Sequence, residues 1–272
     1  MKLIVTIIQA LQIVGVQHQM KEECCLVLCL GLMLNIEGMS HQIKNNGFIV
    51  KVDNEIVELC QGARTEYLTA MPFLKVHAPQ ESFSPRDLER GPWRKLAIGS
   101  VNGVGEPYPQ MLATTYFDER NSGTPFLNAL FSALIGARNR ILGIRENFGC
   151  EPDRDGYWNA CRIHHYPRGG GFMGEHKDTH FPSVQKSSGV PYLQLMALLS
   201  TKKVDFQTGG SFLINRVGIR TNVEDDFPIG AIVMFDGSIS HGVEDVDLDQ
   251  VLDFNLESGR IAAFVSLYQV LR

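Results

Sequence analysis

The segment Arg162–Asp178, RIHHYPRGGGFMGEHKD, decides how the rest of the chain is interpreted. It predicts a β-strand, a glycine-rich bend and a second strand that carries His176 and Asp178. Side chains two residues apart on an extended chain leave the same face of the strand, so this imidazole and this carboxylate can point at one metal ion. Two ligands hold a metal poorly, and the hypothesis of a metal site therefore requires a third ligand elsewhere in the chain.

The third candidate ligand is His241, in the segment VMFDGSISHGVEDV. It follows an apolar run and an Asp-Gly turn, which places it at the start of a strand in the same β-rich region. Two imidazoles and one carboxylate occupy one face of an iron(II) ion and leave its other positions open. A lone HxD pair is weak evidence, whereas HxD followed after a long gap by a histidine behind an apolar strand is much more specific.

The second half of the chain consists of short β-rich runs separated by turn residues. Short strands at this spacing predict a β-sandwich or barrel. In the last run Arg260, Ala262, Phe264 and Ser266 share one face, because side chains alternate along a strand. The runs are Tyr157–Tyr166, Phe172–Lys177, Tyr192–Ser200, Ser211–Ile214, Ala231–Phe235, Ser240–Val246 and Arg260–Leu271.

The first half of the chain carries one strong helix signal. The apolar periodicity of Thr124–Phe148 predicts an amphipathic helix with Thr124 as its N-cap. We expect Gly47–Leu59 to form a first strand or hairpin. The segment Pro79–Pro109 is rich in Pro, Gly, Ser and charged residues, and two interpretations of it are open: a lid over a binding site, or a solvated surface loop.

The composition is that of a soluble globular protein with one large domain: 272 residues, 44% hydrophobic, with a net charge of −5. No basic run or basic–aromatic alternation is present, which argues against nucleic acid as a partner. The six cysteines form no CxxC pair. We therefore interpret them as buried thiols of a cytoplasmic protein rather than as a zinc cluster.

The N-terminus contains two apolar stretches, LIVTIIQALQIVGV and Cys24–Leu34. Each is shorter than the roughly 18–20 apolar residues of a membrane-spanning helix, so we expect no membrane span. We interpret residues 1–40 as a helical extension that packs either on the domain or on a second subunit. In the second case the protein would be a homo-oligomer. Residues 41–272 are then a single domain.

From about Tyr157 to its end the chain resembles the Fe(II)/2-oxoglutarate-dependent dioxygenases, near the prolyl-4-hydroxylase branch. The resemblance rests on YPRGGGFMGEHKD, YLQLMALLSTKKVDFQTGGSF, GAIVMFDGSISHGV and GRIAAFVSLY. It implies an α+β protein, mainly β with N-terminal helices. Its core, at about residues 157–272, would be a double-stranded β-helix, or jelly roll, buttressed by helices.

The resemblance also implies roles for individual residues. His176, Asp178 and His241 would bind Fe(II), and Tyr166 would face the active site. Arg260 would hold the distal carboxylate of 2-oxoglutarate, because a guanidinium pairs well with a carboxylate.

The chain departs from the family pattern at the second co-substrate contact. Leu198 stands where this branch often has a tyrosine, and Ala262 stands where some relatives have a serine. Tyr166, Arg162 and Gln194 are the open candidates for that contact.

The first functional hypothesis is an oxygenase that hydroxylates an unactivated C–H bond of a small molecule, an amino acid or a biosynthetic intermediate, while 2-oxoglutarate and O2 become succinate and CO2. The carboxylate of Asp178 favours hydroxylation over halogenation, since halogenating relatives lack it. One alternative is a prolyl-type hydroxylase of protein residues, and another is a non-catalytic jelly-roll binding protein. The candidate substrate contacts are Arg162, His164, Arg168, His180 and Gln194, with His164 also open to interpretation as a packed core histidine.

Overall fold

The structure is a computed structural model that describes residues 36–52, 54–78, 81–101, 107–120, 123–178, 192–255 and 257–270. The two apolar stretches of the expected N-terminal extension lie outside these ranges. The first described element is helix α3 (Ile36–Asn46), whose Met39 and Ile43 are buried in the main hydrophobic core. Within the described ranges, no helix is long and apolar enough to cross a membrane.

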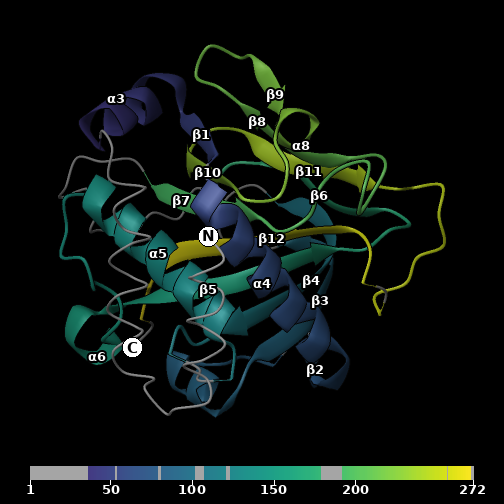
Figure 1. Cartoon of the computed structure of the whole chain (residues 1–272), viewed down its shortest axis with the longest axis horizontal. Helices are drawn as coiled ribbons and strands as arrows, with labels where there is room; N and C mark the ends of the chain where they lie inside the picture. The colour runs from purple at the N-terminus through teal and green to yellow at the C-terminus, as the bar shows by residue number, and fades with distance from the viewer. Residues whose placement is uncertain are drawn as a thin grey trace.

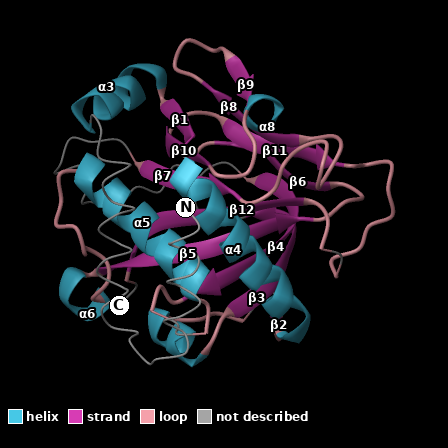
Figure 2. Ribbon diagram, in the orientation of Figure 1, coloured by secondary structure: helices cyan, strands magenta, loops and turns pink. Residues whose placement is uncertain are grey.

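The strands form one large, mainly antiparallel sheet that curls on itself (Figure 2). Neighbouring strands follow the order β1-β10-β7-β12-β5-β4-β6-β11-β8-β9, and β3 and then β2 continue outward from β4. The bounds are β1 (Phe48–Val52), β2 (Val76–His77), β3 (Trp93–Val101), β4 (Tyr108–Phe117), β5 (Tyr157–Tyr166), β6 (Gly171–His176), β7 (Leu193–Leu198), β8 (Gly210–Ile214), β9 (Arg220–Asn222), β10 (Ala231–Asp236), β11 (His241–Val246) and β12 (Arg260–Gln269).

Side chains of β12 alternate between two environments, as the sequence predicts. Ile261 and Val265 belong to the core cluster shared with the helices, whereas Ala262 and Phe264 belong to a second cluster on the other face of the sheet. The sheet therefore has an outer face under the helices and an inner face around a hollow. This confirms the predicted fold class, a mainly β jelly roll buttressed by helices.

Helices α4 (Asn54–Ala70) and α5 (Pro125–Ile141) pack on each other and cover the outer face of β5, β12 and β7 (Figure 1). Leu127, Leu130 and Phe131 of α5 are fully buried there. Burial of each such side chain is worth about 1.5–3 kcal/mol, so these helices stabilise the sheet from one side. The short elements are η1 (Met71–Phe73), η2 (Pro85–Arg90), α6 (Pro152–Asp155) and α8 (Val223–Asp226).

The prediction of a helix that runs to Phe148 is wrong, because α5 ends at Ile141. Gly143 adopts a φ of 66°, outside helical values. The amide of Asn139 donates hydrogen bonds to the carbonyls of Glu146 and Phe148, at 2.7 and 3.0 Å, and so holds the following segment as a compact turn.

The segment Pro79–Pro109 is not the irregular loop that its composition indicated. Much of it is strand β3, which pairs with β4 over its whole length, from Trp93 opposite Tyr116 to Val101 opposite Tyr108. The aromatic and β-branched residues Trp93, Ile98 and Val101 fit a strand, and the charged and glycine residues of the segment concealed it. Residues Trp93–Val101 are therefore part of the sheet wall.

Helix α5 is capped by a residue that local sequence does not identify. Thr124 precedes the helix as predicted, but its side chain makes no capping hydrogen bond. The carboxylate of Glu66, on α4, accepts hydrogen bonds from the backbone N–H groups of Phe126 and Leu127, at 2.9 and 2.8 Å. A carboxylate at this end also interacts favourably with the helix dipole.

Replacement of Glu66 by alanine should therefore lower the free energy of unfolding by about 1–2 kcal/mol, because two N–H groups at the start of α5 lose their acceptor. Urea unfolding measures this. Glu58→Ala is the matched control, since Glu58 is exposed on the same helix, and its effect should stay within about 0.5 kcal/mol. Equal losses in the two variants would contradict the capping role.

Candidate metal centre

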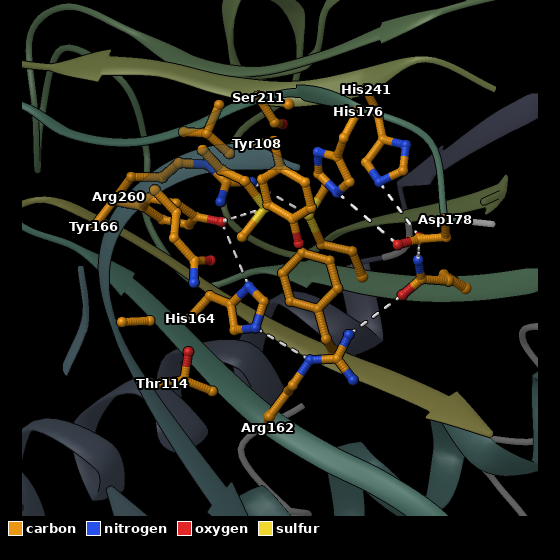
Figure 3. Close-up of a pocket in the computed structure, with 18 of the residues that line it drawn as sticks. Tyr108, Thr114, Arg162, His164, Tyr166, His176, Asp178, Ser211, His241 and Arg260 are labelled. Carbon is orange, nitrogen blue, oxygen red and sulfur yellow. Dashed lines mark hydrogen bonds and ion pairs between the residues drawn. The ribbon is translucent and has the colours of Figure 1, made fainter. Parts of the chain in front are cut away.

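Three potential metal ligands converge on the inner face of the sheet (Figure 3). His176 ends β6 and His241 begins β11, and the antiparallel register places these two residues opposite each other. Asp178 follows two residues after His176. One oxygen of its carboxylate lies 3.4 Å from Nε2 of His241, and the other lies 3.9 Å from Nε2 of His176. The three ligand atoms lie within 4.8 Å of one another, as a shared metal ion requires.

The backbone orients both imidazoles. Nδ1 of His176 lies 2.8 Å from the carbonyl oxygen of Gly174, and Nδ1 of His241 lies 2.9 Å from that of Ile239. A carbonyl only accepts hydrogen bonds, so each Nδ1 carries the proton and each Nε2 offers its lone pair to the centre. Burial, with the neighbouring His241, lowers the pKa of His176 to about 4, which favours the neutral form that binds metals.

Asp178 is held in place by its neighbours. Its backbone N–H donates to the carbonyl of Gly237 at 2.7 Å, and the side-chain amide of Gln194 donates to its carboxylate. A Cβ at position 237 would lie 2.9 Å from that carboxylate and 2.7 Å from the ring of Tyr192, so the Asp-Gly turn needs its glycine for this close approach. Burial alone would raise the pKa of Asp178, but the hydrogen bond to His241 and nearby positive groups keep it below its ordinary value.

The centre opens into a cavity of about 210 Å³. Its wall comes from the inner faces of both halves of the sheet, so residues far apart in the sequence share one space. Besides the three ligands, the residues that line the cavity include Lys95, Tyr108, Arg162, His164, Tyr166, Gln194, Met196 and Arg260.

Arg260, the predicted co-substrate anchor, lies on the cavity wall with its side chain fully buried. Its Nε donates to the carboxylate of Glu224 at 2.5 Å. Glu224 is fixed in turn by the backbone N–H and hydroxyl of Ser211, at 2.7 and 2.8 Å. Nη1 of Arg260 is buried and has no hydrogen-bond acceptor among the described residues. A buried cationic donor of this kind fits the carboxylate of a bound molecule.

Tyr166 and Met196 surround the guanidinium of Arg260. Its carbon lies 5.1 Å from the ring centroid of Tyr166, and its Nη2 lies 3.2 Å from the sulfur of Met196. Met196, rather than Leu198, is therefore the β7 side chain that reaches the arginine. The hydroxyl of Tyr166 lies 3.4 Å from Nδ1 of His164.

The structure brings three of the five predicted substrate residues to the cavity: Arg162, His164 and Gln194. Arg168 is not in this wall, since its Nε lies 3.0 Å from the buried carboxylate of Asp247 and it connects two loops. His180 lies outside the described residues.

Local sequence did not identify three residues of the site. Glu224 lies in the acidic run VEDD, which gives no local indication that it meets Arg260. Tyr108 stacks on the ring of His176, with centroids 3.8 Å apart, and Lys95 lines the same cavity. Both come from the segment interpreted as a loop: Lys95 lies on β3 and Tyr108 begins β4, and recognising these two paired strands would have directed attention to them.

His165 points away from the cavity, although it neighbours His164. Its Nδ1 lies 3.3 Å from the hydroxyl of Tyr67, on α4, and its Nε2 lies 3.0 Å from the carbonyl of Ser258. Burial lowers the pKa of His165 to about 4. It is a packed histidine of the outer face.

Comparison with known proteins shows the fold. No protein-family model matches the chain, and no curated protein is similar to it in sequence. A prolyl hydroxylase from Trichoplax adhaerens, solved with a peptide fragment of the oxygen degradation domain of hypoxia inducible factor, has a TM-score of 0.51 at 12% identity, over 86% of this chain and 89% of that one. The chain thus shares the fold of this oxygenase, as the resemblance implied.

Two further solved structures are similar at lower scores. A prolyl-4-hydroxylase from Pseudomonas putida has a TM-score of 0.47 at 15% identity, over 87% of this chain and all of that one. EctD from S. alaskensis, solved with 2-oxoglutarate and 5-hydroxyectoine, has a TM-score of 0.45 at 14% identity, over 86% of this chain and 76% of that one.

Asp178→Ala should weaken Fe(II) binding by a factor on the order of 100 or more, because it removes one of three converging ligands. Anaerobic calorimetric titration with Fe(II) measures the affinity. Glu175→Gln is the matched control: Glu175 lies three residues before Asp178, on β6, but is exposed, and this variant should bind Fe(II) like the wild type. Unchanged affinity in Asp178→Ala would rule out the centre.

His165 predicts a specific pH dependence of stability. Its pKa is about 4 in the folded protein and about 6.5 when unfolded, so the unfolded state binds a proton first as the pH falls. The stabilisation is complete above pH 6.5 and is lost progressively down to pH 4. Between pH 7.5 and 5 the wild type should lose about 2 kcal/mol more than His165→Gln in urea unfolding. Equal losses would show that His165 titrates normally.

Proposed function

We propose that this protein is an Fe(II)- and 2-oxoglutarate-dependent dioxygenase that hydroxylates an unactivated C–H bond of a small molecule. In this reaction 2-oxoglutarate and O2 are converted to succinate and CO2. The observation that carries the proposal is one cavity that holds two imidazoles and a carboxylate, together with a buried arginine that lacks an acceptor at Nη1. The first group suits iron(II), and the second suits the free end of a dicarboxylate.

His176, Asp178 and His241 would hold the metal on one side and leave its remaining positions facing the cavity. Iron(II), when bound, supplies the redox chemistry that uses O2 and 2-oxoglutarate. The protein's part is to orient the ligands through Gly174, Ile239 and their neighbours, and to keep water away from the reacting groups.

Arg260 would bind the distal carboxylate of 2-oxoglutarate through Nη1. Glu224 already holds Nε, so the guanidinium has one defined orientation before the co-substrate arrives. Preorganisation of this kind lowers the entropy lost on binding. Tyr166 forms the adjoining wall and Met196 packs on the other nitrogen, and these two replace the tyrosine contact that the family often has on β7.

The shape of the cavity supports a small substrate over a protein segment. Within Pro79–Pro109, one of whose two open interpretations was a lid, residues Trp93–Val101 form a strand of the sheet, and the cavity beside it is about 210 Å³. A space of this size suits a co-substrate and a compact second molecule. A non-catalytic jelly roll would have no need of the three convergent ligands or of an unsatisfied Nη1 on Arg260.

Anaerobic addition of Fe(II) and then 2-oxoglutarate should produce a metal-to-ligand absorption band in the visible range. Arg260→Gln should raise the Kd for 2-oxoglutarate at least tenfold while leaving the affinity for Fe(II) unchanged, since the arginine contacts the co-substrate and not the metal. Lys51→Gln, which removes one exposed cation on β1, should behave like the wild type. The proposal fails if the wild type gives no band.

A further inference from the structure

A second buried arginine lies in the same cavity, at a distance from the first. Arg260 pairs with Tyr166 across β12 and β5, whereas Arg162 pairs with Phe264, four residues further along each strand. Four residues of strand span roughly 13 Å, so one small co-substrate anchored at Arg260 does not occupy both positions. Figure 3 shows Arg162 and Arg260 on different sides of His164.

Arg162 differs from Arg260 in its partners. Its Nε donates to His164 at 3.1 Å, its Nη2 to the amide oxygen of Gln194 at 3.3 Å, and its Nη1 to the carbonyl of Ala160 at 3.4 Å. All three acceptors are neutral, and the last two contacts are long. Among the described residues no carboxylate forms an ion pair with Arg162, although its side chain is buried. Asp178 attracts Arg162 only at longer range, and a buried cation without a direct ion-pair partner is costly unless a ligand supplies one.

Lys95 on β3 adds a second positive group to the cavity: it pairs with Thr114, which pairs with His164, two residues from Arg162 along β5. It lines the same space, and the described residues give it no ion-pair partner. Burial, together with the charge of Arg162, lowers the pKa of Lys95. Two cations near each other inside a protein repel unless an anion lies between them.

With iron(II) and 2-oxoglutarate bound, the cavity would carry a net charge of about +1, which one further negative charge would neutralise. The two positive charges of iron(II) and the two negative charges of 2-oxoglutarate would cancel. Two carboxylates, Asp178 and Glu224, then face three cations, Arg260, Arg162 and Lys95. One positive charge remains, which matches a carboxylate better than a phosphate, since a phosphate monoester carries about −1.5 to −2 at neutral pH.

We infer that Arg162 and Lys95 bind a carboxylate group of the substrate, so that the enzyme acts on a small carboxylic acid. This inference rests on the proposed function and names its substrate class. Gln194 connects the two ends of the cavity, because its amide oxygen accepts from Arg162 and its amide nitrogen donates to Asp178. The same side chain therefore positions the anion receptor relative to the metal ligands.

Aromatic rings make this end selective. The guanidinium of Arg162 lies 5.5 Å from the ring centroid of Phe264 and 5.4 Å from that of Tyr268, and the ring of Tyr116 lines the same space. These rings exclude water, which strengthens a charged contact and leaves a neutral analogue with an unpaired cation. A primary amide of the same shape should bind much less tightly than the acid.

The probes are matched pairs of acid and amide: acetate with acetamide, and benzoate with benzamide. Each is titrated calorimetrically into the anaerobic complex of the full chain with Fe(II) and saturating 2-oxoglutarate, and the visible band is monitored to show that the co-substrate stays bound. The proteins are the wild type, Arg162→Gln, Arg162→Lys, Lys95→Gln and the control Lys51→Gln.

In the wild type and in Lys51→Gln, at least one acid should bind at least tenfold more tightly than its amide. Arg162→Gln should abolish this preference while its Kd for 2-oxoglutarate stays within about threefold of the wild type. Arg162→Lys should keep part of the preference, since the charge remains but the paired hydrogen bonds do not. Lys95→Gln should reduce it several-fold, and it tests the site independently if Arg162→Gln fails to fold.

The inference is overturned if neither acid is preferred in the wild type, or if Lys95→Gln and Arg162→Gln keep the full preference. Loss of the 2-oxoglutarate band in Arg162→Gln, with cooperative unfolding intact, would instead assign Arg162 to the co-substrate. A wild type without any band refutes the proposed function itself, so the two failures are distinguishable. Substrate-stimulated succinate release from a panel of carboxylic acids and their amides should then be confined to the acids.

Discussion

His176 ends β6 and His241 begins β11, and the antiparallel pairing of these two strands places the imidazoles opposite each other. The site depends on this register, because a slip of one residue would turn one imidazole to the other face of the sheet. Backbone carbonyls close to each ring in sequence, those of Gly174 and Ile239, then set the protonated nitrogen. Position and tautomer both follow from the backbone. The helices on the outer face contribute stability to this arrangement and no ligand.

The parts of the molecule that local patterns specify were predictable. The alternation along β12, the bend before β6 and the HxD pair each follow from spacing within about ten residues. Gly169 and Gly170 of that bend adopt φ values of 87° and 101°, as a glycine bend predicts. His241 was predicted from the apolar run and the Asp-Gly turn before it, and the resemblance to a known family then implied Fe(II) as the metal. Its prediction of the fold is confirmed, while the roles of His241 and Arg260 remain proposals that the geometry supports.

The parts that sequence reasoning missed depend on contacts between distant segments. Glu224 meets Arg260 36 residues away, and Glu66 caps a helix 60 residues away. Neither carboxylate carries a local signature, because a helix N-terminus or a buried cation can take its partner from any element that folds onto it. Strand β3 was missed for a different reason. Its glycine and charged residues resemble a loop, and only its pairing with β4 makes the segment a strand.

Arg260 and Arg162 differ in whether a carboxylate of the protein pairs with them, and this difference determines how each can bind a ligand. Glu224 neutralises Arg260 and fixes its orientation. This leaves Nη1 as the one directional donor for the distal carboxylate of 2-oxoglutarate, whose other end would bind the metal. Among the described residues Arg162 donates hydrogen bonds only to neutral acceptors, so it can form a direct ion pair with a ligand. Arg260 would therefore contribute mainly a fixed orientation to a bound carboxylate. Arg162 would contribute mainly electrostatic attraction. An arginine lies at each end of the cavity, and the different partners of the two arginines would let one end bind 2-oxoglutarate and the other bind the substrate carboxylate.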